Sequence, residues 1–113
     1  MADLAGRGYL DDASYAHHWV TARVARGFGA TRLRAELRAR GVASRVIDEA
    51  LAGLDGEETL TRAREAARRR LPALRRGRPE RVAARLRDYL LRRGYGAAVV
   101  ARVVRESFGV LAD

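Results

Sequence analysis

Two stretches of this 113-residue sequence decide its fold: LRAELRARGVASRVIDEAL (33–51) and LRDYLLRRGYGAAVVARVV (86–104). Within each stretch the apolar residues recur at spacings of three and four, which is typical of amphipathic helices, and a glycine interrupts the pattern at the same place. The stretches align at a constant offset of 53 residues, and the matched positions are Leu33 with Leu86, Leu37 with Leu90, Gly41 with Gly94, Val46 with Val99, and Ile47 with Val100. The pattern therefore predicts a tandem helical repeat.

Helical spacing continues over the remainder of the chain and predicts six helices. The first is expected to begin at Asp12 and to break at residues 27–29. In the long fourth helix we expect a kink or an early stop at Pro72, and Pro79 is expected as the first residue of the fifth helix. The predicted fold class is all-α, with tandem three-helix repeats that form an elongated, curved array. The predicted domains are residues 1–54 and 55–113.

The apolar and aromatic positions of the helical pattern supply the expected core. Its members are Tyr9, Tyr15, Trp19, Leu33, Leu37, Val46, Ile47, Leu86, Leu90, Val99 and Val100.

The stretch GYLDDASYAHHW (8–19) resembles a chemical site because it gathers acidic, imidazole and aromatic side chains. We interpret it as the start of a helix, where Asp11 and Asp12 cap the first amides. His17 and His18 are adjacent and would point about 100° apart on a helix, so they cannot share a metal ion. We therefore expect no metal site.

Other catalytic constellations are missing from the sequence. The glycine pairs at 6–8 and 27–29 lack the Lys-Ser/Thr of a phosphate loop, and no serine stands in a nucleophile-elbow context. There is no cysteine, and no apolar run approaches the roughly 20 residues that span a bilayer. We expect a cytoplasmic monomer without enzymatic activity or cofactor.

The charge is divided unequally along the chain. Residues 1–61 hold 8 Arg and 9 acidic residues, whereas residues 62–113 hold 15 Arg and 5 acidic residues, a net charge of +10. A solvated helix surface would explain an isolated cluster of arginines. Few acidic residues are interleaved here, so a polyanion or an acidic protein is the better explanation.

The candidate partner-binding residues are arginines, which can pair with phosphates or carboxylates. They are Arg34, Arg38, Arg68, Arg69, Arg70, Arg75, Arg76, Arg78, Arg81, Arg85, Arg92 and Arg93.

Residues 29–51 could also form a helix-turn-helix that reads a DNA sequence. Adenine is usually read by Asn or Gln, and this chain contains neither. Because arginine can read guanine, this alternative stays open but is disfavoured.

Residues 8–51 resemble the signature repeat of the RecX regulatory protein family. The resemblance lies in the opening Gly-Tyr-Leu-Asp-Asp, the Arg-Gly-Phe-Gly break at 26–29 and the Arg-Gly at 40–41; residues 86–104 resemble the last repeat of the family. Family members usually carry a further three-helix repeat before this motif, and this sequence begins only a few residues ahead of it.

The resemblance implies a modulator that binds the RecA filament and limits filament growth, ATP hydrolysis and strand exchange in recombination and the SOS response. It also implies contact with single-stranded DNA enclosed by RecA, and no catalysis. Two alternatives remain at this point. One is a general helical nucleic-acid-binding module without a RecA partner, and the other is a structural domain whose arginines only confer solubility.

Overall fold

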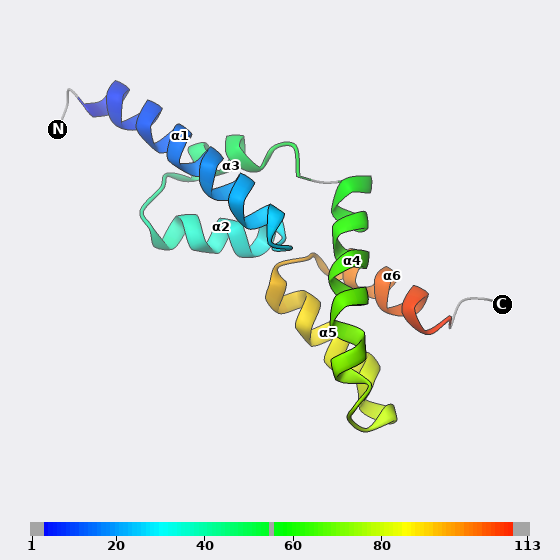
Figure 1. Ribbon diagram of the computed structural model, residues 1–113. Helices are drawn as coiled ribbons and strands as arrows, with labels where there is room; N and C mark the ends of the chain where they lie inside the picture. Colours follow the sequence, from blue (N-terminus) through cyan, green and yellow to red (C-terminus); the bar gives the residue numbers. More distant parts are fainter. Residues whose placement is uncertain (1–3, 55, 110–113) are drawn as a thin grey trace.

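The computed structural model describes residues 4–54 and 56–109, with side chains from residue 10 onward. Within these ranges the chain is helical and contains no strand, which confirms the predicted all-α class (Figure 1). The elements are α1 (Leu4–Ala25), α2 (Ala30–Ala39), α3 (Ser44–Leu51), α4 (Glu57–Leu74), the 3₁₀ turn η1 (Pro79–Arg81), α5 (Val82–Arg93) and α6 (Ala97–Phe108).

The molecule is elongated, as the repeat pattern predicted. Its principal extents are 58 × 26 × 18 Å, and its radius of gyration is 16.9 Å. A compact domain of this length would have a radius of gyration of about 13 Å. Figure 1 shows the reason: α1, α2 and α3 form one bundle, and α4, α5 and α6 form a second bundle beside it.

Each bundle has its own apolar core, and the aligned leucines lie at the centre of both. The first core contains Ala16, Val20, Leu33, Leu37, Val42, Val46, Ile47 and Leu51. The second core contains Leu60, Ala63, Ala66, Ala67, Leu71, Val82, Leu86, Leu90, Tyr95, Val100 and Val103. The same apolar positions are therefore used twice to build two separate three-helix units.

Most of the predicted core is buried, but one aromatic residue is not. Trp19 and Val99 are partly buried against their clusters, whereas Tyr15 is 39% exposed, so its placement in the core was wrong. Ala16 lies on the buried face of α1, and the side chain of Tyr15, one position earlier, points about 100° away from that face. Tyr15 packs instead against Trp19, with 6.0 Å between the ring centroids, as an i, i+4 pair does. The side chain of Tyr9 lies outside the described residues.

The first helix begins earlier than its capping signal predicted. Because α1 starts at Leu4, Asp11 and Asp12 lie inside the helix and cannot cap its first amides. Gly6 and Gly8 each cost a helix only about 1 kcal/mol relative to alanine. Two glycines therefore do not prevent the helix from extending past the aspartates.

The two prolines lie near helix ends. Helix α4 continues past Pro72 and ends two residues later, at Leu74, because a proline removes only one backbone hydrogen bond so close to a terminus. Pro79 is the first residue of η1, which leads directly into α5, so its predicted role is confirmed.

A carboxylate holds α1 against α2. Glu36 accepts hydrogen bonds from the indole Nε1 of Trp19 at 2.9 Å, from Arg23 at 2.6 Å and from Arg32 at 3.0 Å. Partial burial raises the pKa of Glu36, but the hydrogen bonds from these three side chains outweigh it and lower the pKa from 4.5 to about 2. The ionised form is therefore the one that stabilises the first unit.

Removing this carboxylate should change the acid stability of the protein. Because the folded-state pKa lies below 4.5, the stabilisation is present above pH 4.5 and is lost as the pH falls toward 2. We expect Glu36→Gln to lower the free energy of unfolding at pH 7 by about 2 kcal/mol and to flatten its pH dependence below 4.5. Urea denaturation at several pH values measures both effects. The control is Asp88→Asn, on the exposed side of α5. An unchanged pH slope in Glu36→Gln would contradict the assignment.

The two units meet where the end of α5 caps the beginning of α2. The Gly29 amide donates to the Arg93 carbonyl at 2.8 Å, and the Thr31 amide donates to the Gly94 carbonyl at 3.0 Å. The first amides of a helix lack partners within the helix, and here the carbonyls at the end of α5 accept from the amides at the beginning of α2. We call the segments 26–31 and 92–95 the junction.

The junction also caps the end of α1. The Tyr95 hydroxyl donates to the Gly27 carbonyl at 2.7 Å, and the Arg93 guanidinium donates to the carbonyls of Arg26 and Gly27. The same guanidinium stacks on the ring of Phe28, 3.9 Å from the ring centroid. These polar contacts to the backbone join the second unit to the first.

Candidate partner-binding surface

The largest group of candidate arginines lies where α4 turns into α5, at one end of the second unit (Figure 1). We call this group the basic turn; it comprises Arg75, Arg76, Arg78, Arg81 and Arg85, all exposed. Among the described residues, none of the five forms an ion pair with a carboxylate. The chain brings these cations together because the α4–α5 connection is short and α5 folds back along α4.

The three consecutive arginines of α4 are also exposed but are partly satisfied. Arg68 and Arg69 both donate to Glu65, the latter through Nε at 3.1 Å. Arg70 lies 5.1 Å from the ring centroid of Tyr89. The single carboxylate of Glu65 thus pairs with both Arg68 and Arg69, so this part of α4 keeps a net positive charge.

The candidates on α2 lie in the other unit. Arg34 forms an ion pair with Asp48 of α3 at 2.6 Å, and Arg38 is exposed. Figure 1 places α2 beside α1 and α3, away from the connection between α4 and α5. The structure therefore does not bring the α2 arginines to the basic turn.

The last two candidates stand at the end of α5, in the junction. Arg92 is exposed, whereas Arg93 is half-buried and donates to the carbonyls of Arg26 and Gly27. The guanidinium of Arg93 therefore has partners within the chain, unlike those of the basic turn.

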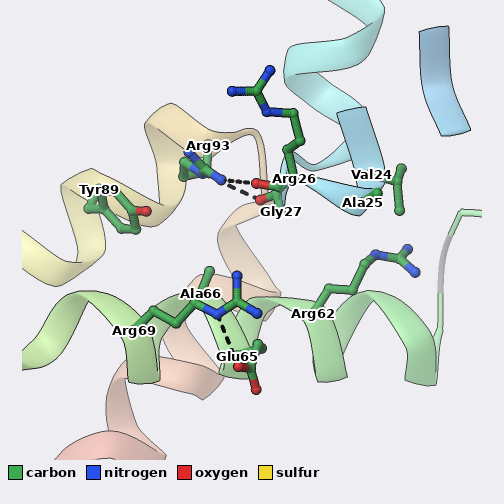
Figure 2. A pocket seen from close by; sticks show the side chains of 10 residues that line it. All are labelled: Val24, Ala25, Arg26, Gly27, Arg62, Glu65, Ala66, Arg69, Tyr89 and Arg93. Atoms are coloured by element: carbon green, nitrogen blue, oxygen red, sulfur yellow. Dashed lines mark hydrogen bonds and ion pairs between the residues drawn. The ribbon is translucent and has the colours of Figure 1, made fainter. Parts of the chain in front are cut away.

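The structure brings two of the candidate arginines, Arg69 and Arg93, together with Arg62, which the sequence reasoning missed. Arg62 and Arg69 of α4 and Arg93 of α5 line a cavity beside the end of α1, shown in Figure 2. The seven-residue spacing of Arg62 and Arg69 places both on one face of a helix and was a usable signal. Nothing in the sequence indicated that this face meets Gly27.

Two further observations concern other kinds of site. Among the described residues, no three His, Cys, Asp or Glu side chains are grouped closely enough to hold a metal ion. None of the described helices combines the length and the apolar character needed to cross a membrane.

Family models match both three-helix units of the structure. The model of the second three-helix domain of RecX matches residues 11–51, and the model of the third matches residues 57–104. The chain belongs to the RecX family. The two matches follow one another along the chain, one for each of the two apolar cores.

Several curated RecX relatives are similar over most of this chain. The protein of Thermobifida fusca is 45% identical over 101 residues, which cover 88% of this chain and 54% of the relative. The protein of Mycolicibacterium vanbaalenii is 40% identical over 104 residues, which cover 86% of this chain and 56% of the relative. The protein of Halorhodospira halophila is 44% identical over 97 residues, which cover 83% of this chain and 57% of the relative. All three are named regulatory protein RecX.

The chain thus spans somewhat more than half the length of these RecX proteins. A comparison with solved structures found no significant match. The relatives are named as regulatory proteins and not as enzymes, which agrees with a regulatory role for this RecX-family chain.

Proposed function

We propose that this chain is a cytoplasmic regulator that binds RecA filaments and limits their growth, ATP hydrolysis and strand exchange in recombination and the SOS response. The observation that carries the proposal is the match of both three-helix units to RecX domain models. We also propose that residues 1–54 and 55–113 are its two domains and that it acts as a monomer.

The shape and the charge of the molecule fit this role. A filament presents the same surface at regular intervals, so a molecule 58 Å long can contact neighbouring subunits. The basic turn offers guanidiniums without acidic partners among the described residues, and arginine forks pair with carboxylates or phosphates in two parallel hydrogen bonds. A chain bound across subunits would oppose the subunit rearrangements of filament growth and ATP turnover.

The direct test is the ATPase activity of RecA stimulated by single-stranded DNA, titrated with this chain at physiological salt. We expect turnover to fall at well below one chain per RecA molecule. Unchanged turnover at equimolar concentration, with the chain folded by circular dichroism, would contradict the proposal.

The basic turn predicts which residues set the inhibitory concentration. We expect Arg76→Ala/Arg78→Ala to raise the concentration for half-inhibition about tenfold, because two surface ion pairs are worth up to about 1 kcal/mol each. The matched control is Arg87→Ala/Arg105→Ala, which removes the same charge from exposed positions of α5 and α6. An equal effect of both double variants on the RecA ATPase would show that only net charge matters.

The unpaired arginines of the basic turn also favour a second candidate function, a nucleic-acid-binding module that acts without RecA. In that case binding to single-stranded DNA should weaken with salt, with a slope of about −0.7 per phosphate contact in a plot of log affinity against log salt concentration. RecA would then make no difference to the affinity. The ATPase titration separates the two functions, because only the regulator reduces turnover at substoichiometric concentrations.

A further inference from the structure

The junction contains a cavity whose charge is unbalanced. Its volume is about 110 Å³, and it is lined by Arg62 and Arg69 from α4, by Tyr89 and Arg93 from α5, and by Gly27 from the segment after α1. We call it the junction cavity. A water molecule occupies about 30 Å³ in the liquid, so the cavity has room for a group larger than a single water.

The guanidiniums around the cavity have unused hydrogen-bond donors. Each guanidinium carries five N–H groups. The Nε of Arg69 donates to Glu65, and within the described residues its two terminal nitrogens have no partner. The contacts of Arg62 are long, 3.5 Å to the hydroxyl of Thr59 and 3.9 Å to Glu58. In Figure 2 the guanidinium of Arg69 points into the space between α4 and the segment of Gly27.

The acceptors near the cavity are already occupied. Glu65 is the one carboxylate that lines it, and its two oxygens accept from Arg68 and Arg69. The carbonyls of Arg26 and Gly27 accept from Arg93, and that of Gly27 also accepts from the Tyr95 hydroxyl. Arg69 shares Glu65 with Arg68, and Glu58 lies 3.9 Å from Arg62 but does not line the cavity, so the arginines that line it outnumber the carboxylates.

We infer that the junction cavity binds a single tetrahedral oxyanion, a phosphate group, held by Arg62 and Arg69 of α4 together with Arg93 of α5. A phosphate has several acceptor oxygens and a negative charge, which match the arginine side chains that line the cavity. Because Arg93 is also bonded to the end of α1, the anion would strengthen the contact between the two units. The inference does not depend on RecA, since the site lies wholly within this chain.

The test uses the isolated chain and inorganic phosphate, compared with chloride at equal ionic strength. At a phosphate concentration ten times the dissociation constant we expect the melting temperature to rise by about 5 °C. Phosphate also stabilises folded proteins nonspecifically, so the decisive readouts are the difference between variants and a saturable shift of the Gly27 amide resonance.

Three variants define the site. Arg62→Gln and Arg69→Gln should each weaken phosphate binding at least about tenfold, because each removes a charge-assisted hydrogen bond worth about 1.5–3 kcal/mol. Glu65→Gln should strengthen binding, because it removes the competing carboxylate. Arg87→Gln is the matched control, since it removes the same charge from an exposed position outside the cavity. Equal weakening by Arg87→Gln, or a Gly27 resonance that does not respond to phosphate, would overturn the inference.

A short single-stranded oligonucleotide then identifies the source of the phosphate. If Arg69→Gln weakens oligonucleotide binding and Arg87→Gln does not, the cavity takes a phosphodiester of a nucleic-acid backbone. If Arg69→Gln weakens the binding of free phosphate alone, the ligand is a small phosphate compound. Both results support the site, and neither bears on inhibition of the RecA ATPase.

Discussion

Gly94→Ala should destabilise the protein by about 3 kcal/mol, whereas Gly41→Ala, at the equivalent position of the first repeat, should cost only about 1–2 kcal/mol. Both glycines have a left-handed backbone conformation, with φ of +103° and +85°. The cost of placing a side chain in that conformation is therefore shared by the two variants. The difference between them comes from the surroundings.

The surroundings of the two glycines differ because only one of them lies in the junction. A Cβ added at Gly94 would stand 2.5 Å from the Cβ of Arg32 and 2.7 Å from the Gly29 carbonyl oxygen, whereas a Cβ at Gly41 would meet nothing within 4 Å. The atoms near Gly94 belong to α2 and to its capping residue and can withdraw only if the units separate. Thermal and urea unfolding of the two variants measure the difference.

Gly29→Ala provides the independent check. Gly29 has φ of −100°, which alanine adopts readily, but its added Cβ would stand 2.5 Å from the Gly94 carbonyl oxygen. We expect Gly29→Ala to lower the free energy of unfolding by about as much as the steric clash does in Gly94→Ala. Gly96→Ala, with open space around the added Cβ, should leave the free energy of unfolding nearly unchanged. Equal stabilities of Gly94→Ala and Gly41→Ala would show that the junction does not hold the units together.

Leu37→Ala and Leu90→Ala should each lower the free energy of unfolding by about 3 kcal/mol, but each should destabilise a different unit of the molecule. Both leucines are fully buried, each in its own core. Truncation leaves a cavity that the surrounding helices fill only in part. Because the cores are separate, Leu37→Ala should accelerate amide exchange in α2 and α3 about 100-fold and leave α5 and α6 little changed.

Leu90→Ala is the matched variant and should give the reverse pattern. Hydrogen exchange followed by mass spectrometry or NMR reads both units in one experiment. If Leu37→Ala accelerated exchange equally in α2 and α5, the two units would unfold as one, and the proposed division into domains 1–54 and 55–113 would be wrong.

The errors of the sequence-based prediction have two physical origins. The start of α1 was placed at Asp12 because aspartates favour N-terminal positions, yet a capping preference is worth only about 1 kcal/mol and does not prevent a helix from extending past it. Tyr15 was assigned to the core on hydrophobicity alone, although a helix buries only one face. In both cases the preference of a single residue type did not decide the outcome. The extent of α1 and the face that it buries did.

By itself, the sequence determined the six helices, the repeat, the buried leucines and the concentration of positive charge in the second half. These properties depend on residues three or four positions apart, or on composition, and a linear pattern records them directly. Only the tertiary structure decided the roles of residues at equivalent positions of the two repeats. Arg40 stacks on Trp19 of its own unit, whereas Arg93 joins the second unit to the first and lines a cavity. The difference arises because only the second Arg-Gly corner meets another unit, and that contact joins residues more than 60 positions apart.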